Sequence, residues 1–130
     1  MQFSPEWVCV IKIKYPKFAR KQQYDTMKRT DNSNIQLTVL IPFMNEGEEV
    51  AATVADVRRT AGKSVDIVVL NDCSTDDYAY EEKLRPYDVR YVCNPKNLGS
   101  APSRDVCVDL CETPYFLFLD AHMRFFCNDW

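Results

Sequence analysis

From residue 35 onward, short apolar runs alternate with stretches of helical periodicity, and polar loops separate the two. Four apolar runs have the length and composition of strands, at residues 37–41, 65–70, 89–93 and 115–119. Helical stretches lie between them, at residues 48–60, from about 77 to 84, and at 100–111. Strands that alternate with helices through short loops predict right-handed crossovers and a mainly parallel sheet. The expected fold class is therefore α/β, with a doubly wound, mainly parallel sheet.

Prolines, a glycine and capping residues set the expected ends of these elements. Pro42 should end the first strand, because proline cannot donate to the hydrogen-bond ladder of a sheet. Gly62 follows the first helix as its stop, and Pro86 closes the second helix. The second helix is expected to begin after the Ser-Thr-Asp sequence of residues 74–76, whose side chains are suitable N-caps.

Residues 1–34 do not follow this alternation. The run at 7–13 is apolar enough for a strand or a buried helical turn, and residues 17–29 favour a helix with a poor apolar stripe. Residues 30–34 form a polar, turn-favouring link. We therefore divide the chain into an N-terminal leader or appendage, residues 1–34, and a domain, residues 35–130.

Composition narrows the class of protein. Hydrophobic residues make up 46% of the chain and charged residues 27%, as in ordinary soluble globular proteins. The net charge of −3, without a basic stripe, argues against a nucleic-acid partner. No run approaches the roughly 18 apolar residues that a membrane helix needs, and the N-terminus lacks the pattern of a signal peptide. The six cysteines show no Cys-x-x-Cys spacing, so we interpret them as reduced thiols, which predicts a cytoplasmic protein.

The clearest chemical signal is the end of the last apolar run. Residues 115–119 are followed at once by Asp120, Ala121 and His122, the only histidine of the chain. The continuous run is typical of a strand buried on both faces, as in the centre of a parallel sheet. Residues two apart in an extended chain point the same way, so Asp120 and His122 can converge where open α/β sheets bind ligands. A structural histidine is the alternative interpretation.

Other strand ends carry polar residues that the same edge of the sheet should collect. Asp72 follows an apolar run and is either an acceptor for a base or ribose, or a helix cap or turn former. Arg104, near the start of a helix, is expected to pair with a phosphate or to form an exposed salt bridge. No phosphate-binding loop of the Walker type, no Gly-x-Gly-x-x-Gly and no Gly-x-Ser-x-Gly is present, which argues against a P-loop enzyme, a dinucleotide-binding enzyme and a serine hydrolase.

Taken together, these loops resemble the nucleotide-sugar-binding half of GT-A fold glycosyltransferases, a Rossmann-like unit, and especially the large family-2 group. The resemblance covers residues 37–130, about three quarters of the chain. Four segments in the family's order carry it: 37–46, similar to its opening strand and Pro-x-x-Asn-Glu loop; 68–76, similar to Val-Asp-Asp-x-Ser-x-Asp; 97–105, similar to Asn-x-Gly followed by Ala-Arg-Asn; and 118–122, at the place of the Asp-x-Asp metal motif.

Two departures from the family pattern affect the expected site. Asn71 replaces the first of the paired aspartates, whereas Asp72 matches the one that contacts the nucleotide base in relatives. His122 replaces the second metal-binding aspartate. The resulting Asp-x-His motif is similar to that of polypeptide N-acetylgalactosaminyltransferases, where both residues bind manganese. Because imidazole is a poor ligand for Mg²⁺, this resemblance implies Mn²⁺, or another divalent cation, at Asp120 and His122.

The resemblance implies a metal-dependent glycosyltransferase of the hexosyl or N-acetylhexosaminyl class that transfers sugar from a UDP-sugar to a glycan, protein or lipid acceptor. The residues it assigns to the nucleotide are Pro42, Asn45, Glu46, Asp72, Arg104 and Asp120. Relatives carry the acceptor lobe, and the general base of inverting members, beyond the position of Trp130. We therefore expect a donor-binding half with little activity alone and assign no catalytic residue.

Two other functions remain as alternatives. The first is a non-catalytic nucleotide-sugar-binding or protein-interaction module of the same fold. The second, a nucleotidyltransferase of similar topology, is less favoured because the first loop lacks a glycine-rich, arginine-containing phosphate cradle.

Overall fold

A computed structural model describes residues 10–11, 34–128 and 130. The elements in chain order are β1 (Val10–Ile11), β2 (Leu37–Phe43), α1 (Glu48–Ala61), β3 (Val65–Asn71), α2 (Tyr80–Leu84), the 3-10 helix η3 (Arg85–Tyr87), β4 (Arg90–Cys93), α3 (Ser100–Leu110) and β5 (Tyr115–Phe118). Of the leader, residues 1–34, only β1 and Asn34 are described, so the other predictions for that segment lie outside the described residues.

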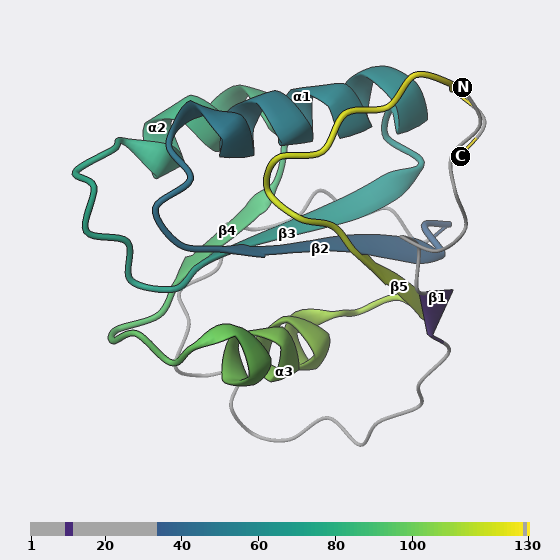
Figure 1. The fold of residues 1–130 in the computed structure, drawn as a ribbon. Helices are drawn as coiled ribbons and strands as arrows, with labels where there is room; N and C mark the ends of the chain where they lie inside the picture. Colours follow the sequence, from purple (N-terminus) through teal and green to yellow (C-terminus); the bar gives the residue numbers. More distant parts are fainter. Residues whose placement is uncertain (1–9, 12–33, 129) are drawn as a thin grey trace.

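The strands form one sheet in the order β1-β5-β2-β3-β4. β2 pairs in parallel with β3 and with β5, and β3 pairs in parallel with β4. The short β1 is antiparallel to β5. Helices α1 and α2 cover one face of the sheet, and α3 covers the other (Figure 1). The prediction of a doubly wound, mainly parallel sheet is therefore confirmed.

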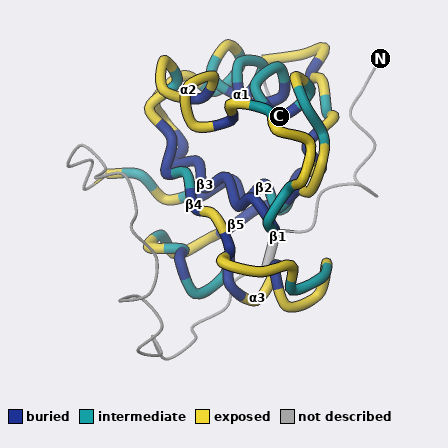
Figure 2. Tube along the Cα trace, turned by 90° about the vertical axis from the view of Figure 1, so that its left-hand side faces the viewer, coloured by how far each residue is buried: buried dark blue, intermediate teal, exposed yellow. Residues whose placement is uncertain are grey.

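Apolar side chains on both faces of the sheet explain this arrangement. Every residue of β3 is buried, which fits a central strand covered by helices on both sides. Val50, Val54 and Val57 recur at helical spacing in α1 and are fully buried against one face. Val106 and Leu110 of α3 are buried against the other face. In Figure 2 the strands form a buried layer between helices whose outer surfaces are exposed.

Pro42 does not end the first strand, contrary to the prediction from its missing N–H. β2 continues to Phe43, with Pro42 level with Leu70 of β3. The Leu119 N–H donates to the carbonyl of Leu40, so Leu40 faces β5, and Pro42, two residues further on, faces the same side. Because the pairing with β5 ends at Leu40, the nitrogen of Pro42 faces a side on which the ladder has ended. The lost donor therefore costs no sheet hydrogen bond.

The prediction that residues 74–76 cap the second helix is also wrong. α2 begins at Tyr80, and its N-cap, Ala79, makes no side-chain hydrogen bond. The three polar side chains have other partners: Ser74 and Thr75 bind Asn45, and Asp76 accepts a hydrogen bond from the hydroxyl of Tyr80. Side chains suited to capping also form loop contacts, and sequence spacing alone does not distinguish the two uses.

The expected central position of the 115–119 run is wrong as well. β5 lies between β2 and the two-residue β1, and its first residue, Tyr115, is exposed. Phe116 and Leu117 belong to the apolar clusters on opposite faces of the sheet. The continuous apolar run therefore reflects cover on both faces, which a strand near the edge of a sheet can also have.

A buried ion pair joins β3, β4 and the end of α3. The guanidinium of Arg90 donates to the Asp66 carboxylate over 2.7 Å and to the carbonyl of Leu110 over 2.9 Å. Asp66 is 3% exposed and Arg90 6%. Charges removed from water to this degree require close pairing, so each member depends on the other.

We expect Asp66→Asn to lower the free energy of unfolding by about 3–5 kcal/mol, because it leaves the Arg90 charge buried without a counter-charge. Urea denaturation followed by circular dichroism measures the change. Glu49→Gln is the matched control, since it breaks an exposed ion pair with Arg124 and should cost less than about 1 kcal/mol. Equal losses in the two variants would contradict the assigned importance of the buried pair.

Candidate functional site

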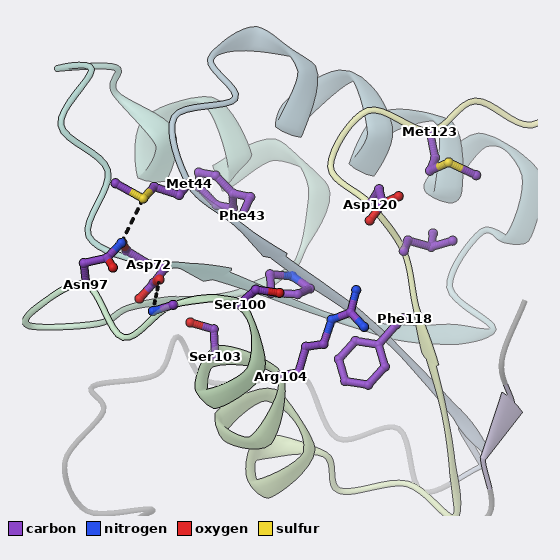
Figure 3. Close-up of a pocket in the computed structure, with 13 residues that line it drawn as sticks. Phe43, Met44, Asp72, Asn97, Ser100, Ser103, Arg104, Phe118, Asp120 and Met123 are labelled. Carbon is purple, nitrogen blue, oxygen red and sulfur yellow. Dashed lines mark hydrogen bonds between the residues drawn. The ribbon is translucent and has the colours of Figure 1, made fainter. Parts of the chain in front are cut away.

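A cavity of about 770 Å³ lies where the carboxyl ends of β2, β3 and β5 meet the start of α3. Its lining comes from four separate segments of the chain: Pro42, Phe43 and Met44; Asp72; Asn97, Gly99, Ser100, Ser103 and Arg104; and Phe118, Leu119, Asp120 and Met123. Figure 3 shows Asp72 and Asp120 on opposite sides of this pocket, with Arg104 between them. Carboxyl ends of parallel strands are the usual ligand sites of open α/β sheets.

The Asp72 carboxylate organises the loop that leads into α3. One of its oxygens accepts hydrogen bonds from the Leu98 N–H and the Asn94 side-chain amide, each over 2.8 Å, and the other accepts from the Gly99 N–H over 2.9 Å. Asp72 therefore fixes the loop before α3 from a distant part of the sequence while it also lines the pocket. Both roles expected for this residue, turn organiser and ligand acceptor, remain compatible with its position.

Hydrogen bonds also set the ionisation of Asp72. Burial alone raises the pKa of its carboxyl group, but hydrogen bonds from the Leu98 N–H, the Asn94 amide and the Gly99 N–H outweigh burial and hold the pKa below its ordinary value of 3.8. The residue is consequently a charged, acceptor-only group at neutral pH. A carboxylate has about four acceptor positions; these three bonds occupy three of them, and a hydrogen bond from the Ser103 hydroxyl also lowers the pKa.

The loop after β4 closes one side of the pocket. The Asn97 side-chain amide donates to the sulfur of Met44 over 2.8 Å and to the carbonyl oxygen of Asp72 over 3.3 Å, which joins the ends of β2 and β3 (Figure 3). Gly99 precedes α3 with a φ of 90°, a backbone conformation that other residues rarely adopt. The sequence Asn97-Leu98-Gly99 thus supplies both the contact between strand ends and the turn into the helix.

Arg104 supplies the positive charge among the residues that line the pocket. Its side chain is exposed, and its guanidinium lies over the ring of Phe118, 5.4 Å from the ring centroid. A cation held against an aromatic face has fewer accessible conformations than a free surface arginine while its N–H groups stay available. No exposed salt bridge of Arg104, the alternative expected from the sequence, is present among the described residues.

Asp120 and His122 flank a residue that is anchored in the core. Ala121 is 3% exposed, whereas Asp120 and His122 are both exposed. Within the part of the chain that the structure describes, no side chain pairs with the Asp120 carboxylate, which lines the pocket. The imidazole of His122 lies outside that lining, and its Nδ1 is 3.5 Å from a carboxylate oxygen of Glu46.

The structure therefore places the predicted nucleotide residues in two groups. Pro42, Asp72, Arg104 and Asp120 line one cavity. Asn45 and Glu46 lie beside it: the Asn45 side chain accepts from the Thr75 N–H over 2.7 Å and donates to the Thr75 hydroxyl, which ties together the loops after β2 and β3. Glu46 contacts His122 instead. The ligand roles of these residues stay predictions.

Several pocket residues were not assigned from the sequence. Phe43, Met44, Ser103, Phe118 and Met123 line the cavity, and most are apolar residues that periodicity assigns to a core. One polar residue outside this lining could have been recognised from the sequence. Thr53 interrupts the apolar stripe of α1, between Val50 and Val57, and its hydroxyl binds the segment after Asp120.

Within the described residues, no helix has the length and apolar character needed to cross a membrane.

Comparison with known proteins gives a family and a fold. Residues 38–129 match the sequence model of the family described as Glycosyl transferase family 2. A similar protein is the teichoic acid poly(glycerol phosphate) polymerase of Staphylococcus epidermidis, which is 29% identical over 90 residues, or 66% of this chain and 12% of that protein. The match with the family model covers β2 to β5 and the helices between them, whose ends form the pocket.

Two solved structures share the fold. One is the mannosyltransferase PcManGT from Pyrobaculum calidifontis in complex with GDP-Man and Mn²⁺, with a TM-score of 0.62 and 16% identity over 72% of this chain and 29% of that one. The other is S. aureus TarS in complex with UDP, with a TM-score of 0.56 and 22% identity over 68% of this chain and 28% of that one. The chain thus spans less than a third of each of these proteins. The expected likeness of the Asp-x-His motif to polypeptide N-acetylgalactosaminyltransferases stays a prediction.

The position of Asp72 predicts a specific response of stability to acid. Because its folded-state pKa lies below that of the unfolded chain, about 3.9, its contribution is complete above that value and is lost as pH falls through the folded-state pKa. Asp72→Asn replaces an acceptor oxygen with an NH₂ group and should lower the free energy of unfolding at pH 7 by about 1–3 kcal/mol. Urea titrations at several pH values measure both effects.

The deficit of Asp72→Asn should stay constant from pH 7 to about pH 4 and shrink below that, as the pH falls from the unfolded-state pKa of about 3.9 toward the folded-state pKa, because acid removes the same interactions from the unmodified protein. Asp105→Asn, at an exposed aspartate of α3, is the control and should match the unmodified protein throughout. A deficit that stays constant over the whole pH range would show that the carboxylate charge is not the source of the stabilisation.

Proposed function

Because this chain belongs to glycosyl transferase family 2, we propose that it is the donor-binding half of an enzyme that transfers a sugar from a UDP-sugar to a glycan, protein or lipid acceptor. The observation that carries the proposal is the single cavity lined by Asp72, Arg104 and Asp120, which come from three distant segments. The fold shared with TarS in complex with UDP supports uridine as the nucleoside.

In this proposal the nucleoside lies between the ends of β2 and β3. Phe43 and Met44 offer apolar and polarisable surface to a base, and the charged Asp72 carboxylate lines the pocket beside them as an acceptor for a base or ribose donor. Pro42 and Met44 line the same wall, so the strand end limits how deeply the base enters. A base read through its N–H groups fits an acceptor-only residue at this position.

The diphosphate lies toward Arg104 and the first turn of α3. Gly99, Ser100 and Ser103 face the cavity, so the positive end of the helix dipole adds to the guanidinium charge. Two N–H groups before the helix already bind Asp72, Pro102 has no N–H, and the Ser103 N–H donates to the Gly99 carbonyl. This leaves the N–H groups of Ser100 and Ala101, the Ser100 hydroxyl and Arg104 as phosphate donors. Guanidinium groups bind phosphate oxygens in a bidentate manner, which orients the leaving diphosphate.

The proposed divalent cation site uses Asp120 and His122. The fit rests on their donor chemistry: an exposed carboxylate without a protein partner among the described residues, and an imidazole whose Nδ1 faces Glu46, which leaves Nε2 for a metal ion. Within the described residues, no cluster of three or more potential ligands surrounds this pair, so donor phosphates and water would complete the coordination. A carboxylate with an imidazole suits Mn²⁺, and PcManGT, which shares the fold, was solved with Mn²⁺. A divalent cation here would supply positive charge that stabilises the leaving diphosphate.

Asn45 and Glu46 act from beside the cavity in this proposal. Asn45 holds the loops after β2 and β3 together through both its backbone and its side chain. Glu46 places a carboxylate oxygen 3.5 Å from Nδ1 of His122, which favours the imidazole tautomer with a proton on that nitrogen. These contacts shape the site without direct contact to the nucleotide.

Calorimetric titration of UDP, with and without Mn²⁺, tests the proposal. We expect Mn²⁺ to strengthen UDP binding, and Asp120→Asn to weaken the Mn²⁺-dependent binding by about tenfold or more, or at least about 1.4 kcal/mol, because the carboxylate charge is lost. Glu82→Gln, at an exposed carboxylate of α2, is the matched control and should bind as the unmodified protein does.

The outcomes separate the parts of the proposal. UDP binding that is indifferent to Mn²⁺ would remove the cation from the site. UDP binding by the complete protein without sugar transfer would identify a non-catalytic nucleotide-sugar-binding module. Absence of UDP binding in the complete protein would overturn the donor assignment itself.

A further inference from the structure

A threonine in the middle of α1 binds the turn that carries the proposed cation ligands. Thr53 is fully buried, and its hydroxyl donates to the carbonyl of Ala121 over 2.7 Å. The same oxygen accepts from the N–H of Met123 over 3.0 Å and from the guanidinium of Arg124 over 3.2 Å. A hydroxyl has one donor and two acceptor positions, so all of its capacity is directed at residues 121–124.

Thr60 of the same helix shows the usual alternative. Its hydroxyl donates back to the carbonyl of Asp56, one turn earlier, over 2.8 Å, although it also accepts from the indole N–H of Trp130 over 2.7 Å. Thr53 instead directs its hydroxyl across the interface to a segment 68 residues further along the chain. The comparison shows that the bond of Thr53 to the turn is not the default behaviour of a helical threonine.

The two main contacts of Thr53 lie on either side of His122. The Ala121 carbonyl belongs to the peptide group before His122, and the Met123 N–H belongs to the peptide group after it. Because peptide groups are planar, the orientation of these two planes sets both backbone dihedrals of His122. One buried oxygen atom therefore fixes the direction in which the imidazole leaves the backbone.

The backbone of Asp120 is fixed on one side by the sheet and on the other side by the Thr53 hydroxyl. The Leu119 N–H donates to the carbonyl of Leu40 over 3.0 Å, which is the last bond between β5 and β2. One residue after Asp120, the Ala121 carbonyl is bound by Thr53. The segment between these points has little freedom, although the Asp120 side chain itself is exposed.

We infer that Thr53 is the positioning residue of the cation site: its hydroxyl sets the backbone of the Asp120-Ala121-His122 turn so that the carboxylate and the imidazole serve one divalent ion. The inference rests on the proposed function, since it assigns the ion to those two ligands. Arg124, which also binds Glu49 over 2.8 Å, adds a second link from α1 to the same turn. The role depends on the hydroxyl and not on the volume of the side chain.

Mn²⁺ binding in the presence of UDP, measured from the electron paramagnetic resonance signal of the free ion, tests this role. Thr53→Val keeps the shape of the side chain and removes the hydroxyl, and we expect it to weaken Mn²⁺ binding roughly 10–100-fold, the usual effect of losing a residue that orients metal ligands. Thr53→Ser keeps the hydroxyl and should bind within a few-fold of the unmodified protein. Thr60→Val is the matched control on the same helix and should leave Mn²⁺ binding unchanged.

Several results would overturn the role of Thr53. Unchanged Mn²⁺ affinity in Thr53→Val would do so, as would equal loss in Thr53→Ser and Thr53→Val, which would identify packing as the cause. Amide hydrogen exchange at Met123 should be faster in Thr53→Val than in Thr53→Ser, and equal rates would contradict the observed bond. If Thr53→Val does not fold, Thr53→Cys, with its weak thiol donor, provides the same comparison with Thr53→Ser.

The failure of this inference is distinguishable from failure of the proposed function. An unmodified protein that binds UDP but no Mn²⁺ removes the cation site, and the role of Thr53 with it. An unmodified protein that binds Mn²⁺ with UDP while Thr53→Val binds it equally well removes the role of Thr53 alone.

Discussion

The parallel register of β2 with both of its neighbours determines where the site lies. β2 and β3 stay paired as far as Phe43 and Asn71, whereas β5 pairs with β2 only as far as Leu40. The chain after β5 therefore leaves the sheet three residues earlier than the end of β2. This stagger leaves the end of β2 as a wall beside the shorter strand, and Pro42, Phe43 and Phe118 line the cavity that results.

Polar side chains then hold the loops around this cavity in place. Asp72 accepts N–H groups from the loop before α3, Asn45 does so for the loop after β3, and Thr53 binds the turn after β5. In each case a side chain satisfies backbone groups of a loop that is distant in sequence, which removes the cost of leaving those groups unpaired. The site consequently rests on rigid elements, because its lining residues lie at strand ends, in the loops directly after them and in the first turns of α3.

The elements of this fold could be predicted because local signals agree with the global arrangement. The apolar runs of β2, β3, β4 and β5 and the valine stripe of α1 follow directly from periodicity. The continuation of β2 through Pro42 could not, since it depends on which side of the strand lacks a partner. The partners of Asp72 in the loop before α3 and the loop contacts of residues 74–76 also escaped prediction, because they lie up to 30 residues away. Thr53 could have been recognised from the sequence, because it is a polar residue on the otherwise apolar stripe of α1.

Asp72 and Asp120, the two acids of the pocket, differ in how many hydrogen bonds their carboxylates accept from the protein. Asp72 is 5% exposed and accepts three hydrogen bonds from its own chain, so most of its charge serves to hold the loop and the helix end. Asp120 is exposed and, among the residues the structure describes, has no pairing side chain, while its backbone is fixed by β2 on one side and by Thr53 on the other. A carboxylate that is held in place without a protein partner keeps its acceptor positions free for a ligand, whereas those of Asp72 are largely occupied by its own chain. This difference in hydrogen bonding, and not the order of the two residues in the sequence, is why we propose Asp120 as the cation ligand.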